Sequence, residues 1–402
     1  MPRIGLDIGE SRSSIPAQLN QLKINQQNAE CKIPVKNFCT GRANAMALAD
    51  LRWAKYRMVL KAKERMLLPA FKGSMLRGGF GHVLKHTCCS VQGSPCVGCI
   101  LQEKCPYAYL FETAPRHGSS YLSKNSQVPR PYLFEPPLDG RWVYEAGEEL
   151  SFGLVLIGRS ISFLPYFIYA IQELGNIGVT RRKYKYELLR VDAVEYFTGH
   201  FEPIYSNGDR MVSNRAIVGT YSDCINYAAK MVSDKVSIKF TTPTRIKYAG
   251  KYWFNDIPFV ALVQNLTIRA NALALLHCDS GWDERLKALR DEAAGVVTAW
   301  SGLTKVDVIR YSSRQGKPDT LSGAVGSITY ESKTTSDNTE YRNARQARQS
   351  GLSGILPLLV LGQIIHVGSD CVFGCGKYVI GESEEPETRV NHELGAWINQ
   401  EK

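Results

Sequence analysis

The sequence lacks any long hydrophobic run. Its longest apolar stretches, Ile161 to Ile171 and Ile355 to Val367, each contain a proline. Both are shorter than the ~20 residues that a helix needs to cross a bilayer. The segment from Met1 to Ser14 is polar and has no apolar core of the kind found in signal peptides. We therefore expect a cytoplasmic protein that does not act within a membrane.

Acidic residues are scarce relative to basic ones. The chain of 402 residues has 38 Asp and Glu against 49 Lys and Arg, which gives a net charge of +11. A basic balance of this size favours an acidic partner, with nucleic acid first and an anionic membrane second. The alternative is a basic surface that only maintains solubility. The length suggests two or three domains.

Cysteine, by contrast, is abundant for a cytoplasmic chain. Five of the eleven cysteines lie within eighteen residues: Cys88, Cys89, Cys96, Cys99 and Cys105. In a reducing compartment such clustering points to metal rather than to disulfides. Cys96 and Cys99 have the C-x-x-C spacing of a zinc knuckle, and Cys88 or Cys89 with Cys105 would complete a structural zinc site. Unbound thiols and an iron–sulfur cluster remain open as alternatives.

The order of predicted elements is repeated in the two halves of the chain. Strands are expected at 150–157, 236–242 and 246–254, helices at 75–86, 161–174, 258–277 and 353–367, and a proline-rich loop at 129–137. This order predicts an α+β protein with two tandem ferredoxin-like (RRM-like) domains. The first domain would span 51–205 with a cysteine-rich insertion at 88–105, and the second 235–382 with a C-terminal glycine-rich loop. Residues 1–50 would be an N-terminal extension and 383–402 a tail.

Each half ends in a glycine-rich turn after an apolar helix. The second turn holds Gly368, Gly374 and Gly376, and the first, looser turn contains Gly175 and Gly178. Glycine lets another backbone approach closely, so a phosphate backbone could lie across such a turn. Four-stranded sheets of this type commonly bind single-stranded RNA. The alternative is a coincidence between two ordinary helix–turn–strand connections.

Basic residues near these turns would contact phosphates and make affinity depend on salt. The alternative is a solvated charged surface. The candidates are Arg181, Arg182, Lys183 and Lys185 after the first turn, Lys377 at the second, and Arg342, Arg345 and Arg348 in a segment with the composition of a flexible loop.

Four passages resemble the CRISPR-associated endoribonucleases that process precursor CRISPR RNA, the Cas-six family of the RAMP superfamily. They lie at 71–81 with 105–112, at 152–175, at 311–315 with 321–326, and at 366–378. The resemblance implies two ferredoxin-like domains side by side, repeat RNA held across them, and cleavage without a metal ion. One departure is Cys375, which stands where superfamily turns often have Phe or Leu between two glycines.

Cleavage without a metal needs a base for the RNA 2′-hydroxyl, an acid for the leaving 5′-oxygen and cations for the phosphorane. His366, just before the second turn, is the first candidate, and its alternative is a residue that orders the turn. His82 and His86, with Lys85, are the rivals, because the resemblance implies a histidine on the first helix. Residues that would orient the scissile phosphate are Tyr311, Ser312 and Arg314. His277 is expected to be a packing residue.

The resemblance thus predicts an endoribonuclease that cuts CRISPR repeat transcripts into crRNA, leaving a 2′,3′-cyclic phosphate and a 5′-hydroxyl. A second hypothesis is a non-catalytic RAMP subunit that binds guide RNA beside other subunits of a CRISPR effector complex. A third is a zinc-containing RNA-binding module unrelated to CRISPR.

Overall fold

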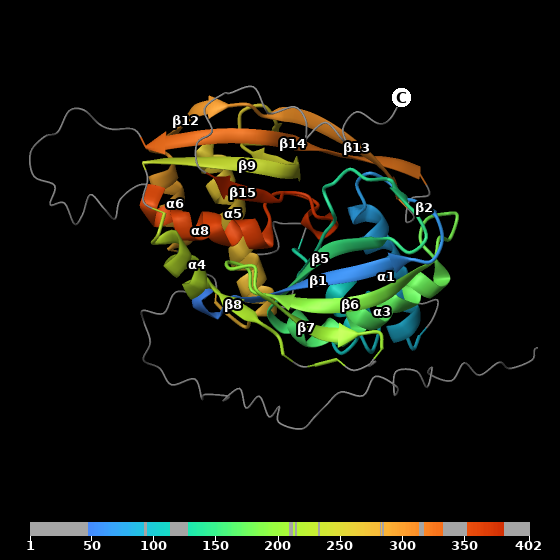
Figure 1. Cartoon of the computed structure of the whole chain (residues 1–402). Helices are drawn as coiled ribbons and strands as arrows, with labels where there is room; N and C mark the ends of the chain where they lie inside the picture. Colours follow the sequence, from blue (N-terminus) through green and yellow to red (C-terminus); the bar gives the residue numbers. More distant parts are fainter. Residues whose placement is uncertain are drawn as a thin grey trace, which may run out of the picture.

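The computed structural model describes residues 47–91, 95–112, 128–208, 212–213, 215–231, 234–281, 283, 285–312, 317–332 and 352–381. Two antiparallel sheets lie in separate layers, one built from each half of the chain (Figure 1). Helices of the second half lie beneath their own sheet, on the side that faces the first half (Figure 1).

The first sheet has the strand order β3–β5–β1–β6, with β7 at one edge and β8 extending along β1. The unit runs β1 (Arg52–Ala62), α1 (Gly73–Cys88), β3 (Tyr132–Glu135), β5 (Glu149–Ile157), α3 (Leu164–Ile177) and β6 (Tyr186–Val194). This is the βαββαβ order of a ferredoxin-like domain. Its smaller elements are η2 (Ala47–Asp50), β2 (Met66–Leu67), α2 (Pro106–Phe111), β4 (Val143–Tyr144), η3 (Gly158–Phe163), β7 (Phe201–Ser206) and β8 (Val218–Thr220).

The second sheet repeats this arrangement, with the order β12–β14–β9–β15 and with β13 paired to β14. The unit runs β9 (Lys235–Thr244), α5 (Phe259–His277), β12 (Val296–Ser301), β14 (Lys317–Ser332), α8 (Leu352–Ile365) and β15 (Tyr378–Gly381). The predicted pair of ferredoxin-like folds is confirmed. Its smaller elements are α4 (Tyr221–Ala228), β10 (Ile246–Tyr248), β11 (Lys251–Trp253), α6 (Leu286–Ala293), β13 (Thr304–Ser312) and η4 (Cys371–Phe373).

Two local predictions were wrong. The proline-rich segment 129–137, expected as a loop, contains strand β3. The strand lies at the sheet edge, where prolines next to a strand are tolerated. The segment 246–254, expected as one strand, is the β10–β11 hairpin, whose turn residues Ala249 and Gly250 both have positive φ.

Helix α1 forms in spite of three internal glycines because two of them allow close packing. A Cβ on Gly79 would lie 2.6 Å from the side chain of Leu174 on α3. A Cβ on Gly81 would lie 2.3 Å from the ring of Phe111 on α2. Tertiary contacts therefore override the poor helix propensity of glycine.

The end of β5 is buried on both faces, which places the two domains against each other. Leu154 and Leu156 belong to the core shared with α1 and α3. Val155 and Ile157 point to the other face and belong to the core of α5 and α8. Each such side chain contributes about 1.5–3 kcal/mol when fully buried. This part of the first sheet is therefore covered and is not an open platform for RNA.

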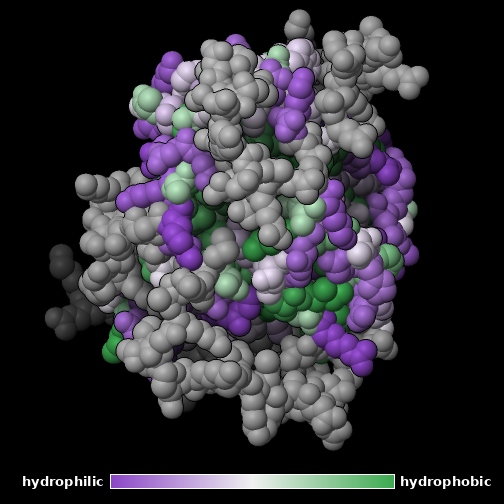
Figure 2. Space-filling view, turned by 90° about the vertical axis from the view of Figure 1, so that its left-hand side faces the viewer, coloured by the Kyte–Doolittle hydropathy of each residue, from purple (hydrophilic) through white to green (hydrophobic). Residues whose placement is uncertain are grey.

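Helix α5 is long and apolar enough to cross a membrane by composition, but 67% of its apolar window is buried inside the protein. It is accounted for as a core helix. The face on which β12 and α6 lie is mostly hydrophilic around smaller hydrophobic areas (Figure 2).

Candidate functional site

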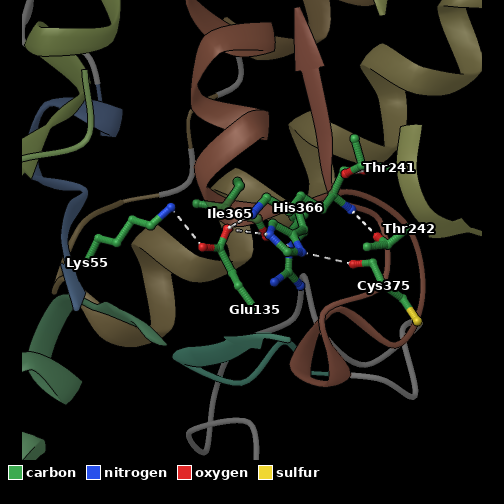
Figure 3. Close-up of polar contacts among 9 residues, drawn as sticks. Lys55, Glu135, Thr241, Thr242, Ile365, His366 and Cys375 are labelled. Atoms are coloured by element: carbon green, nitrogen blue, oxygen red, sulfur yellow. Dashed lines mark hydrogen bonds and ion pairs between the residues drawn. The ribbon is translucent and has the colours of Figure 1, made fainter. Parts of the chain in front are cut away.

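A buried carboxylate joins the two domains. Glu135, the last residue of β3, is 4% exposed and lies 2.8 Å from Nζ of Lys55 on β1 (Figure 3). From the second domain, Nζ of Lys377 lies 3.1 Å and Nε2 of His366 3.3 Å from the same carboxylate. Strands β1 and β3 of the first domain and the glycine-rich loop of the second domain therefore meet at this one carboxylate.

The charge of this cluster follows from its surroundings. Burial alone would raise the pKa of Glu135, but Lys377, Lys55 and the hydrogen bond from His366 together hold it well below its ordinary value. Burial is the main cause that lowers the pKa of His366. We therefore expect Glu135 to be an ionised carboxylate near pH 7.

His366 has no exposed side-chain surface. Its Nδ1 lies 3.0 Å from the carbonyl oxygen of Cys375 across the loop, and its Nε2 faces Glu135. A phosphate could reach the ring only if the loop opened, so this geometry does not support the predicted role of His366 in cleavage. The structure places it where it orders the turn. His277 is likewise a packing residue, with its ring nitrogens near Tyr109 and a backbone carbonyl.

The glycines of the second turn serve contacts inside the protein. A Cβ on Gly376 would lie 1.9 Å from the carbonyl oxygen of Val367, and one on Gly374 would lie 2.7 Å from that of Phe134. Both glycines have positive φ, as does Gly368. Contact between this loop and RNA remains a prediction, and its partly exposed residues, including Ser369 and Lys377, are where such contact would occur.

The histidines of α1 are exposed. His82 and His86 lie on the outer face of the helix with ring centroids 4.6 Å apart, and Lys85 is exposed between them in sequence. The pKa of His82 is lowered by its partial burial and by the neighbouring His86. Two imidazoles and an ammonium group therefore share one accessible surface, which is a set able to move protons and bind a phosphate.

The basic residues after the first glycine turn divide into two groups. Arg181, Arg182 and Lys183 are exposed. Lys185 instead donates through Nζ to the carbonyl oxygens of Asn176 and Ile177 at the end of α3, which suits a cation at a helix C-terminus. The first three are available to a phosphate backbone.

Four predicted contacts lie outside the described residues. Arg314 falls in 313–316, and Arg342, Arg345 and Arg348 fall in 333–351. The backbone of Tyr311 and Ser312 belongs to β13.

The cysteines lie at the end of α1 and the start of α2. Cys88 ends α1, and Cys105 precedes α2, which packs on α1. Burial, with the nearby thiols of Cys105 and Cys89, raises the pKa of Cys88 to about 12. Among the described residues, no three His, Cys, Asp or Glu side chains are grouped as metal ligands. The thiols supply suitable chemistry, and the zinc site remains a prediction.

Sequence reasoning missed Glu135 and Lys55. The only signal for Glu135 was an acidic residue closing the apolar run Tyr132 to Phe134, directly before two prolines. Its partner His366 is 231 residues away in sequence. Nothing local marks the two as neighbours.

Comparison with known proteins assigns the two halves separately. Residues 238–378 match the model of the CRISPR-associated endoribonuclease Cas6, and residues 51–217 match a model described as an N-terminal domain. An uncharacterized protein of Archaeoglobus fulgidus is 26% identical over 314 residues, which are 78% of this chain and 92% of that protein.

Among solved structures, a chain of a partial Cas6-RT-Cas1–Cas2 complex covers 86% of this chain with a TM-score of 0.50 and 15% identity, over 49% of its own length. A Cas6 product complex has a TM-score of 0.49 and 16% identity, over 82% of this chain and 99% of that chain. At 15% identity, the chain of the partial complex supports only a similar fold. The family match over residues 238–378 confirms that the chain resembles the Cas6 family.

Proposed function

We propose that the protein is a metal-independent endoribonuclease that cleaves CRISPR repeat RNA in precursor transcripts to give mature crRNA. The observation that carries the proposal is the exposed pair His82 and His86 on the first helix of a ferredoxin-like domain. The match of residues 238–378 to the Cas6 model supports the choice of RNA.

The RNA supplies its own nucleophile. His82, which is kept neutral by its lowered pKa, accepts the proton of the 2′-hydroxyl as that oxygen bonds to phosphorus. His86 in its protonated form donates to the 5′-oxygen as the bond between that oxygen and phosphorus breaks. Lys85 offsets the charge of the phosphorane. The products are a 2′,3′-cyclic phosphate and a 5′-hydroxyl.

The test uses purified protein and labelled repeat RNA in EDTA. We expect cleavage at one position in each repeat, loss of cleavage in His82→Ala and His86→Ala, and RNA binding that changes little. His200→Ala is the matched control, because His200 is also exposed but lies away from α1 after β6. Full activity in both α1 variants would remove the assignment of these histidines.

A second function, guide-RNA binding without cleavage, has one observation in its favour. The histidine beside the glycine-rich loop is fully buried, so the loop itself offers no exposed imidazole to a bound phosphate. RNA binding without cleavage by the wild-type protein in EDTA would favour this function. In that case other subunits of a CRISPR effector complex become the expected partners.

Three further parts of the proposal concern the protein partners, a structural zinc ion and the cellular location. A chain of similar fold occurs in a Cas6-RT-Cas1–Cas2 complex, which motivates a search for CRISPR-associated partners by copurification. Structural zinc is proposed from cysteine spacing alone, and metal analysis of the wild type against Cys96→Ser with Cys99→Ser would test it. A cytoplasmic location also stays a proposal, and cell fractionation would test it.

A further inference from the structure

The β10–β11 hairpin carries an unusual concentration of aromatic and basic residues. Six of the eight residues from Lys247 to Phe254 are Lys, Tyr, Trp or Phe. Its two-residue turn holds Ala249 at φ 49°, a conformation that costs a residue with a Cβ about 1 kcal/mol. The hairpin is therefore tightly bent and presents both strands at the surface.

The side chains of the hairpin form a stack of rings and cations. Tyr252 is 47% exposed, and its ring is stacked on that of Phe254 at an interplanar angle of 29° and a centroid distance of 6.5 Å. Nζ of Lys247 lies 5.8 Å from the Tyr252 ring, and Nζ of Lys251 lies 4.0 Å from the ring of Trp253. Neither lysine forms an ion pair with a carboxylate in the described part of the chain.

The base of the hairpin is fixed to the glycine-rich loop. Arg245 lies between the two: its guanidinium is 5.3 Å from the Tyr252 ring and 2.9 Å from the carboxylate of Asp370. The backbone N–H of Ser369 also donates to the carbonyl oxygen of Arg245. The hairpin and the partly exposed stretch 368–370 thus form one continuous surface.

We propose that this hairpin is a binding site for unpaired RNA nucleotides. The exposed face of Tyr252 stacks on a base, and Lys247 and Lys251 contact the flanking phosphates. Base stacking on an aromatic ring does not need a particular base, and unpaired nucleotides alone leave both base faces free. The proposal rests on the proposed function and extends it, since it adds a second binding site for the single-stranded part of a repeat transcript.

An anionic membrane is the other partner that aromatic and basic side chains could bind. The RNA is favoured because an exposed ring lies beside two cations, which suits a base next to its phosphates, and because Arg245 continues the surface into the glycine-rich loop.

Fluorescence anisotropy with a labelled single-stranded 12-mer of uridine tests the site in the full-length protein. We expect Tyr252→Ala to weaken binding about tenfold, and Tyr252→Phe, which keeps the ring, to bind as the wild type does. Lys247→Ala and Lys251→Ala should each lower the slope of log K against log salt by about 0.7. Trp142→Ala is the control, because Trp142 is a 52% exposed aromatic residue of the first domain.

Unchanged binding in Tyr252→Ala, or an equal loss in Trp142→Ala, would overturn the site. A loss of binding to phosphatidylserine vesicles in Tyr252→Ala, with oligonucleotide binding intact, would also overturn it in favour of a membrane. The outcome is separable from the proposed function. A wild-type protein that never cleaves repeat RNA but loses oligonucleotide binding in Tyr252→Ala would keep the site and remove the nuclease.

Discussion

The histidines of α1 and the histidine of the glycine-rich loop occupy opposite environments. His82 and His86 are exposed and face each other, whereas His366 is fully buried between a carboxylate and a backbone carbonyl. Sequence position favoured His366, because it precedes the glycine-rich turn. The difference teaches that nearness to such a turn does not make a histidine accessible, since the turn here packs against the neighbouring domain.

The strongest test of this difference is to replace each histidine and to measure both the cleavage rate and the unfolding midpoint. His86→Ala should reduce the cleavage rate about 100-fold or more, the usual contribution of a general acid, and leave the unfolding midpoint nearly unchanged. His366→Ala should lower the unfolding midpoint in urea, because it leaves Glu135 with one partner fewer. If His366→Ala abolishes cleavage at a temperature where the variant is fully folded, then His366 and not the α1 pair is needed for cleavage.

The next largest effect is expected at the carboxylate. Glu135→Ala removes the partner of Lys55, Lys377 and His366 and should lower the free energy of unfolding by about 3 kcal/mol. Glu148→Ala is the control, because its ion pair with Arg141 is exposed and should contribute little. Equal urea midpoints for the two variants would show that Glu135 does not hold the domains together.

The pH dependence of stability should report on the same group. The pKa of Glu135 lies well below its ordinary value of 4.5 in the folded state, so the unfolded chain takes up the proton first as pH falls. The stability that this carboxylate contributes is complete above the unfolded pKa and is lost as pH falls toward the folded pKa. Urea unfolding from pH 6 to pH 3 should show a shallower decline in Glu135→Gln. If the free energy of unfolding falls equally with pH in the wild type and in Glu135→Gln, the lowered pKa of Glu135 is contradicted.

Much of the fold could be predicted from local pattern, but the site could not. The alternation in 150–157 and the apolar helix near 258–277 correspond to β5 and α5 because burial imposes their periods. Strand β3 was hidden by the prolines beside it. The β10–β11 turn was hidden because Ala249 and Gly250 lack the Asn-Gly signature of such turns. The pairing of Glu135 with His366 depends on how two domains dock, which no local pattern records.

A smaller difference in stability is expected between a glycine that is in contact with a neighbouring strand and a glycine that only allows a turn. Gly374 and Gly147 share a φ of 91°, but a Cβ on Gly374 would meet Pro136 and the carbonyl oxygen of Phe134, whereas one on Gly147 would meet nothing within 4 Å. Gly147→Ala should cost about 1 kcal/mol from the backbone conformation alone. Gly374→Ala should cost about 2 kcal/mol, since β3 must also shift. Equal unfolding midpoints would mean that the loop is not held against β3.

The smallest effect is expected when a single surface cation is replaced. Here too, an exposed cation and one that is already paired with a carboxylate should behave differently. Arg181 and Arg182 are exposed, so each replacement by Ala should lower the salt slope of single-stranded RNA binding by about 0.7. Lys377 is 24% exposed and already bound to Glu135, so Lys377→Ala should change that slope less and the unfolding midpoint more. A full slope change in Lys377→Ala at unchanged stability would show that RNA displaces Glu135 from this lysine. The buried cluster would then be part of the binding site, because the ammonium group would exchange a carboxylate for a phosphate.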